Sequence, residues 1–131
     1  MTASVITFRT SRFDPGSEPP NPINPIAGYS VLVWLRTSLS SLDFSEPDTE
    51  DWGWYSTVEF EGLSYLVGAC CQGQPGDEPP LDWAIQIKKQ RGLMDVLRGR
   101  NRMDRDDGLC ALIHAALLAE PAFTNVELSA D

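Results

Sequence analysis

Glu50–Cys71, EDWGWYSTVEFEGLSYLVGACC, is the stretch that decides the fold, because it carries the clearest strand pattern in the chain. Hydrophobic and polar residues alternate on both sides of Glu61-Gly62, which is typical of two antiparallel strands joined by a tight turn. A two-residue turn places the larger apolar side chains on one face of this hairpin. The pairs on that face are Phe60 with Leu63, Val58 with Tyr65, Ser56 with Val67 and Trp54 with Ala69.

The turn leaves one alternative open. A type I′ turn needs positive φ at both central residues, which is unfavourable for Glu61. A three-residue loop with a bulge would relieve Glu61, but it would oppose Val58 to Ser64 and exchange the faces of several side chains. Each large side chain buried on a sheet contributes about 1.5–3 kcal/mol. We therefore predict the two-residue turn, with strands over Trp52–Phe60 and Leu63–Cys71.

Further strands are expected beside the hairpin, because a hairpin alone is marginal in water. Asp82–Lys88 alternates cleanly and predicts a third strand, whose tryptophan and two isoleucines face the core. Short runs at Ser4–Arg9 and Thr124–Leu128 predict a first and a last strand. We expect these two to pair with the three-stranded meander or with each other.

Helices are expected in three segments. The run after Asn24-Pro25 also holds residues that favour a strand, but its length and its start signal favour a helix from Pro25 to about Ser40. Arg91–Arg98 predicts a short helix with inward-facing Leu93, Met94 and Leu97. A third helix is expected to follow three acids and to end before Pro121. Its acids are Asp104, Asp106 and Asp107, and its apolar stripe is Leu109, Leu112, Ile113, Ala116 and Leu117.

The predicted order of elements, β-α-β-β-β-α-α-β, is typical of an α+β fold. We expect a single layer of mainly antiparallel sheet with the helices packed on one face. The length of 131 residues is near the commonest size of one domain, so we predict one domain over residues 1–131. Its two long connections are a proline-rich surface loop at 13–25 and an acidic loop at 41–51.

Location and redox state can also be predicted. The N-terminus lacks a charged start followed by a long apolar run, so we expect no secretory signal. No apolar run approaches the length that spans a membrane. The three cysteines, an odd number, favour free thiols in a reducing compartment. Together these features predict a cytoplasmic protein.

Charge is distributed unevenly along the chain. The net charge of −9 argues against general binding of nucleic acids. Seven of the ten cations nevertheless lie within residues 88–105: Lys88, Lys89, Arg91, Arg98, Arg100, Arg102 and Arg105. With its two acids this segment carries +5. Five acids precede the hairpin in the 41–51 loop: Asp43, Glu46, Asp48, Glu50 and Asp51.

Catalytic and metal-binding signatures are missing from the sequence. It holds no phosphate-binding glycine loop, no nucleophile elbow and no zinc-protease motif. A zinc site would need both Cys70 and Cys71, but adjacent residues of a strand point to opposite faces. His114 is expected at the border of the core on the last helix, where a lone histidine is usually structural. We therefore predict no catalytic residue, no metal and no cofactor.

The aromatic residues beside the acids are the strongest functional signal. Trp52 and Tyr55 follow Glu50 and Asp51, and the pattern leaves their place open, whereas it puts Trp54 and Trp83 on the core face. They could form an aromatic cluster that caps the core. They could instead form a rim that binds a basic protein surface, because interface anchors are often aromatic. The predicted partner-binding residues are Asp48, Glu50, Asp51, Trp52 and Tyr55.

Our first functional hypothesis is a non-catalytic interaction protein with a basic protein partner. Adaptors and bacterial immunity proteins, which neutralise a toxin, follow the same physical logic, by composition alone. A second hypothesis is an enzyme that uses acids of 43–51 opposite arginines of 98–105. A third is a phosphate or RNA binder through the seven cations of 88–105. The basic segment could also pair with the acidic loop of its own molecule or of a second copy, which leaves a homo-oligomer open.

Overall fold

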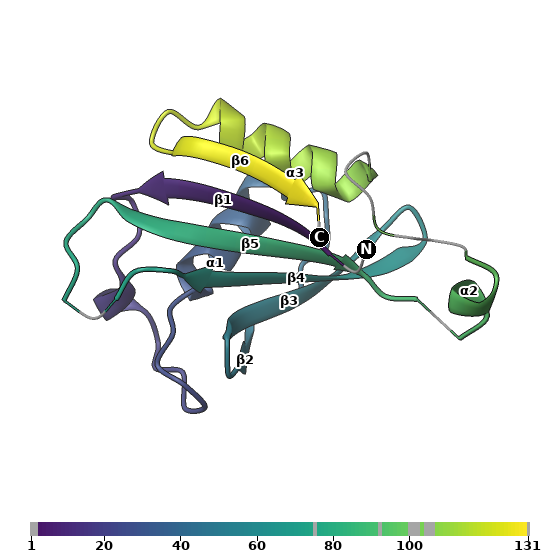
Figure 1. Cartoon of the computed structure of the whole chain (residues 1–131), viewed down its shortest axis with the longest axis horizontal. Helices are drawn as coiled ribbons and strands as arrows, with labels where there is room; N and C mark the ends of the chain where they lie inside the picture. The colour runs from purple at the N-terminus through teal and green to yellow at the C-terminus, as the bar shows by residue number, and fades with distance from the viewer. Residues whose placement is uncertain (1–2, 75, 92, 100–102, 104–106, 131) are drawn as a thin grey trace.

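The computed structural model describes residues 3–74, 76–91, 93–99, 103 and 107–130. Six strands form one antiparallel sheet in the order β2-β3-β4-β5-β1-β6 (Figure 1). The strands are β1 Ser4–Thr10, β2 Asp48–Glu50, β3 Gly53–Phe60, β4 Leu63–Cys71, β5 Leu81–Lys89 and β6 Thr124–Ala130. The helices are α1 Tyr29–Ser38, α2 Leu93–Leu97 and α3 Gly108–Ala119, with a short 3-10 helix at Pro15–Ser17. The predicted α+β class is confirmed, with one more strand than predicted.

The register of the central hairpin is confirmed residue by residue. Phe60 pairs with Leu63, and the pairs continue to Trp54 with Ala69. The turn residues Glu61 and Gly62 both have positive φ, 52° and 78°. Glu61 accepts this unfavourable conformation because the alternative register would turn the buried side chains of two strands outward.

The core lies between the sheet and the helices α1 and α3. In Figure 1, α1 lies behind the sheet and α3 runs beside β6. Ile6 and Phe8 of β1 and Trp83 of β5 are at most 1% exposed, as the alternating pattern predicts. The helices contribute these buried side chains: Val31, Leu32 and Leu35 from α1, and Leu109, Cys110, Ile113 and Leu117 from α3. The opposite face of the sheet is covered by no described helix.

The start of α1 differs from the prediction. The helix begins at Tyr29 rather than Pro25, because its free N–H groups are bound by a carboxylate from the proline-rich loop. Glu18 accepts hydrogen bonds from the backbone N–H groups of Gly28, Tyr29 and Ser30 at 2.9–3.0 Å, and from the hydroxyl of Ser30. A carboxylate at this end of a helix satisfies unpaired donors and the helix dipole. The proline-rich loop is therefore fixed to the helix.

The 41–51 segment is only partly a loop. Asp48–Glu50 forms the short edge strand β2 against β3, and Phe44 makes an isolated bridge to Val58. Phe44 is 2% exposed and belongs to the core. The prediction of a plain loop was wrong. The many acids of this segment resemble a surface loop, but the segment runs beside β3 and pairs with it.

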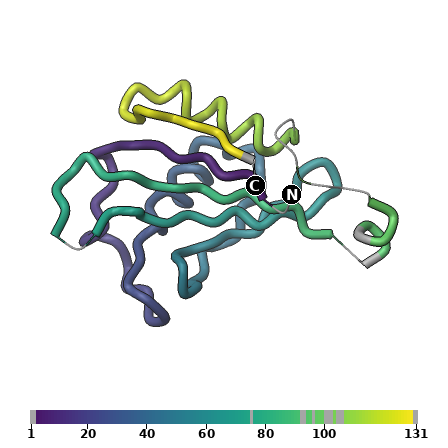
Figure 2. The backbone as a smooth tube through the Cα atoms, in the orientation of Figure 1, coloured from purple at the N-terminus to yellow at the C-terminus, as the bar shows by residue number. Residues whose placement is uncertain are grey.

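Three apolar side chains predicted to face inward are exposed. Met94 and Leu97 of α2 are 49% and 70% exposed, and Leu112 of α3 is 40% exposed. In Figures 1 and 2, α2 projects beyond one end of the sheet, so no sheet face lies beneath it. On α3 Leu109, Ile113 and Leu117 are buried as predicted, but Cys110 rather than Leu112 packs inward beside them.

The start of α3 is fixed by a buried ionic network. Asp107 accepts hydrogen bonds from the N–H groups of Leu109 and Cys110 at 3.1 and 3.2 Å. Its other oxygen accepts from the Tyr65 hydroxyl at 2.8 Å and lies 2.9 Å from Nζ of Lys89. The Asp107 side chain is 3% exposed and that of Lys89 is 11% exposed. The network therefore joins α3 to β4 and β5.

Candidate functional site

The sheet register gathers most of the predicted partner-binding residues on the face opposite the helices. Trp54 is buried in the core, so Tyr55 points to the opposite face. Asp48 pairs with Tyr55 across β2 and β3, and its side chain shares that face. Glu50 lies two residues further along β2 and points the same way. Asp51 is exposed in the turn that follows.

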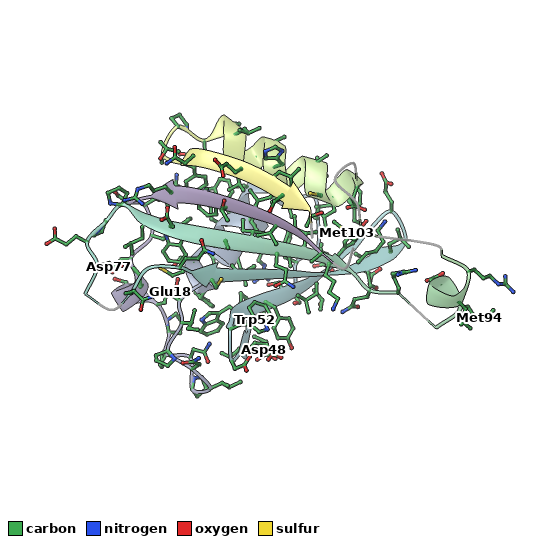
Figure 3. All side chains as sticks on the ribbon, in the orientation of Figure 1. Glu18, Asp48, Trp52, Asp77, Met94 and Met103 are labelled. Atoms are coloured by element: carbon green, nitrogen blue, oxygen red, sulfur yellow. The ribbon has the colours of Figure 1, made fainter. Side chains whose placement is uncertain are left out.

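Trp52 lies on this same face, over a glycine of β4. A Cβ atom added to Gly68 would stand 2.4 Å from the Trp52 ring, so only glycine leaves room for the indole. Gly68 pairs with Tyr55, which places the two aromatic residues beside each other. Figure 3 shows Trp52 and Asp48 close together at the lower edge of the sheet. We name these five residues, Asp48, Glu50, Asp51, Trp52 and Tyr55, the acidic-aromatic surface.

The proline-rich loop holds the turn that carries this surface. Asn21 donates hydrogen bonds from Nδ2 to the carbonyl oxygens of Glu50 and Gly53, at 3.1 and 2.9 Å. Asn24 donates to the carbonyl of Asp51 at 2.8 Å. Between them Ile23 is 57% exposed. No local sequence pattern predicts this arrangement, because it depends on side-chain hydrogen bonds between segments about 30 residues apart.

The acids change the electrostatics of Tyr55. Its pKa is raised above the ordinary value of 10.0, first by the negative charge of Asp48, then by burial and by Glu50. The Tyr55 hydroxyl lies 3.5 Å from Oδ2 of Asp48. Carboxylates so close oppose the formation of a tyrosinate. The surface is therefore a site of concentrated negative potential beside two aromatic rings.

We predict that Asp48→Asn lowers the pKa of Tyr55 toward 10.0, because it removes the largest cause of the shift. The measurement is a pH titration of the tyrosine ring signals by NMR. Glu127→Gln, at the opposite edge of the sheet, is the control and should leave this pKa unchanged. Since folding raises the pKa, the stability that this group contributes is lost as pH rises above 10.0. An Asp48→Asn variant with the wild-type Tyr55 titration would contradict the geometry.

The predicted anion-binding cations differ in their exposure and in their bonding partners. Lys88 and Arg98 are exposed, whereas the side chain of Lys89 is 11% exposed and pairs with Asp107. Arg91 donates to the backbone carbonyl of Asp95 at 3.1 Å. The remaining three, Arg100, Arg102 and Arg105, lie outside the described residues. Lys89 therefore has a structural role in the ion pair with Asp107. Among the described cations of this segment, Lys88 and Arg98 are the exposed ones.

Acids of the 41–51 loop and the basic segment are not joined by an ion pair among the described residues. Glu46 of the loop instead pairs with Arg36 of α1 at 2.9 Å. A shallow hollow of about 180 Å³ beside the loop is lined by Asp43, Ser45, Thr57, Val58 and Glu59, none of them cationic. This hollow therefore offers no acid–arginine pair for catalysis.

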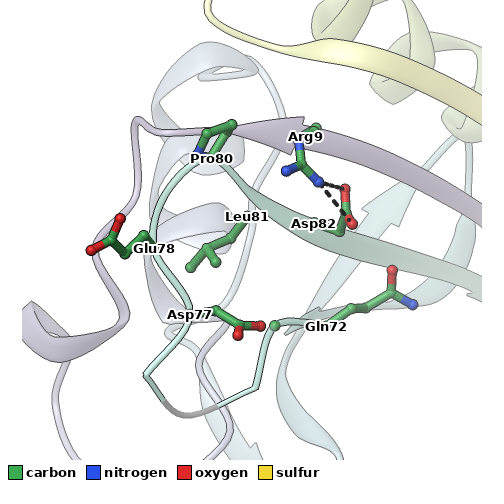
Figure 4. Close-up of a pocket in the computed structure, with 8 residues that line it drawn as sticks. Arg9, Gln72, Asp77, Glu78, Pro80, Leu81 and Asp82 are labelled. Carbon is green, nitrogen blue, oxygen red and sulfur yellow. Dashed lines mark hydrogen bonds and ion pairs between the residues drawn. The ribbon is translucent and has the colours of Figure 1, made fainter.

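A second hollow, of about 230 Å³, opens at the start of β5 (Figure 4). Arg9 and Asp82 form an ion pair across it at 3.2 Å. Its lining residues are Arg9, Gln72, Gly73, Asp77, Glu78, Pro80, Leu81 and Asp82. The hollow is polar and shallow, and its one arginine is neutralised by Asp82. It is formed by the β4–β5 loop and the start of β5, and it shares no lining residue with the acidic-aromatic surface.

The cysteines are not activated. Burial is the main cause that raises the pKa of both Cys70 and Cys71, so their thiols are poor nucleophiles at neutral pH. Among the described residues, no group of three or more histidine, cysteine or acidic side chains is placed to bind a metal ion. The described helices include none that is long and apolar enough to cross a membrane.

Comparison with known proteins found no match among protein-family models, curated proteins or solved structures.

Proposed function

We propose that this chain is a non-catalytic protein-interaction module that binds a basic partner through the acidic-aromatic surface. The observation that carries the proposal is the register of β2, β3 and β4. It brings the side chains of Asp48, Glu50 and Tyr55 to one face. On the same face the Trp52 ring packs directly over Gly68. Acids and aromatic rings that are separate in a flexible chain thus become one surface.

The chemistry of the surface suits lysine- or arginine-rich protein segments. Tryptophan and tyrosine are the residues that most often anchor protein interfaces. Arginine and lysine also bind over aromatic rings, and nearby carboxylates add charge pairing. The negative potential that raises the pKa of Tyr55 would attract such a partner and accelerate its association.

A partner is expected to bind through side chains rather than as an added strand. Strand β2 is three residues long and Pro47 precedes it. The N–H of Thr49 is already bound by the carboxylate of Asp48 at 2.8 Å. Short strands, proline and charge are the features by which sheet edges resist pairing. The side chains of the face therefore remain as the binding element.

The proposal is tested with a fluorescein-labelled ten-residue peptide that alternates arginine with leucine. The test variant carries Asp48→Asn, Glu50→Gln and Asp51→Asn. Each exposed ion pair contributes up to about 1 kcal/mol, so loss of three should weaken binding roughly tenfold or more. The measurement is the Kd from fluorescence anisotropy at low and high salt.

The matched control carries Glu61→Gln, Glu78→Gln and Glu127→Gln, which change the net charge equally at exposed positions away from the surface. Its Kd should stay within about twofold of the wild-type value, because distant exposed charges are screened by salt. Equal weakening in both variants would show attraction to net charge alone and would contradict the proposal, as would an absence of peptide binding to the wild type.

A further inference from the structure

The projecting helix α2 carries exposed apolar side chains beside cations. Met94 and Leu97 are three residues apart, which puts them on one side of the helix, and they are 49% and 70% exposed. Figure 3 shows Met94 at the far end of the molecule, away from the sheet. Lys88 before the helix and Arg98 after it are exposed. The projection therefore exposes apolar side chains, with one exposed cation at its end and another on the strand before it.

The acidic-aromatic surface has the complementary chemistry. Asp48, Glu50 and Asp51 provide negative charge, and the half-buried ring of Trp52 provides an apolar contact. Ile23, held beside them by the hydrogen bonds of its neighbours, is 57% exposed and adds a second apolar contact. On the donor side, Lys88 and Arg98 are the exposed cations among the described residues of this segment. Charge and apolarity thus match between the two surfaces.

The two surfaces lie apart within one molecule. In Figures 1 and 2, α2 stands at one end of the long axis, while β2 and the 20–25 loop lie together at the bottom of the molecule, away from α2. We infer that α2 of one copy docks on the acidic-aromatic surface of a second copy. This inference rests on the proposed function, and it names a second copy of the chain as the basic partner.

The contact is head to tail, because donor and acceptor are different surfaces. Every open assembly then keeps a free donor at one end and a free acceptor at the other, so assembly continues unless it closes into a ring. Each copy also carries −9, and the general repulsion between copies opposes the local attraction. We therefore expect weak association that grows with protein concentration and weakens as salt rises.

Two variants separate the surfaces. The first carries Glu50→Lys and Asp51→Lys, which remove the acceptor. The second carries Met94→Ser, Leu97→Ser and Arg98→Glu, which remove the donor. All five positions are exposed, so the fold should tolerate the changes. Sedimentation velocity of each variant, of the wild type and of an equimolar mixture gives the sizes of the species.

The wild type should form species larger than a dimer as its concentration rises, and each variant alone should be monomeric. The mixture should give a one-to-one dimer and nothing larger, because each partner supplies the one surface that the other lacks. A monomeric wild type, a variant that still assembles alone, or a mixture that stays monomeric would overturn the inference.

The donor variant also separates this inference from the proposed function. It keeps the acceptor surface and should bind the arginine–leucine peptide with the wild-type Kd. Peptide binding together with a monomeric wild type would refute self-association and leave the proposed function standing. A wild type that binds no peptide would refute the proposed function itself.

Discussion

Asp107→Ala is expected to lower the free energy of unfolding by about 3–5 kcal/mol, because it breaks the largely buried ion pair between Asp107 and Lys89. The substitution also removes the acceptor of the Tyr65 hydroxyl and of the first N–H groups of α3. Loss of a helix cap alone costs about 0.5–2 kcal/mol. The measurement is urea denaturation followed by circular dichroism.

Asp82→Ala is the matched control for this variant. Asp82 also forms an ion pair, with Arg9 at 3.2 Å, but the side chains of that pair are 39% and 55% exposed. Exposed pairs contribute at most about 1 kcal/mol, so the control should stay near wild type. Adding Lys89→Met to Asp107→Ala should restore part of the lost stability, since no buried charge then remains. Equal small losses in both single variants would contradict a buried network.

Gly28→Ala is the second variant expected to destabilise the protein strongly. A Cβ atom at this position would stand 2.1 Å from the carbonyl oxygen of Ala69, closer than any real contact. The Ala69 carbonyl belongs to the backbone and the added Cβ is bonded directly to the backbone of residue 28, so a whole segment must shift. The shift would strain the bond from the Cys71 N–H to the Ala27 carbonyl, 2.7 Å, and the cap that Glu18 provides to α1.

We expect Gly28→Ala to cost at least about 1–3 kcal/mol, the usual range for overpacking. Gly16→Ala is the control, because the nearest atom to its added Cβ, Oδ1 of Asp14, lies at 3.5 Å. Its effect should stay within about 0.5 kcal/mol. Thermal unfolding of both variants decides the matter, and a Gly28→Ala protein as stable as Gly16→Ala would show that the loop does not pack closely on β4.

The hairpin could be predicted to the residue because its register depends on local features. Alternation over two strands and one glycine turn leave only two registers, and the burial of side chains such as Val58 and Tyr65 chooses between them. The same reasoning placed Trp83 in the core. Where strand register and burial depend on residues that are neighbours along the chain, they can be predicted from the sequence.

The start of α1 could not be predicted in this way. Asn24-Pro25 is a common helix start, but the true cap is Glu18, ten residues before the first bonded N–H group. The exposure of Met94 and Leu97 follows from α2 lying beyond the sheet, which no local pattern contains. Such errors arise where long-range packing overrides local preference.

The candidate site was predicted in part. Asp48, Trp52 and Tyr55 were chosen from sequence because acids and aromatic residues were adjacent, and the register of three strands brings them to one face. The asparagines that hold the turn were missed, because nothing near them in sequence indicates their bonds. Lys89 was assigned to anion binding, yet its buried pair with Asp107 could be recognised only from the fold.

The acidic-aromatic surface as the binding site is tested most directly by NMR. Amide and indole signals of the ¹⁵N-labelled donor variant, which should be monomeric, are followed while the arginine–leucine peptide is added. The largest shifts should fall on the indole N–H of Trp52 and on the amides of residues 48–55. Shifts centred instead on α3, or on the hollow around Arg9 and Asp82, would contradict the proposed function.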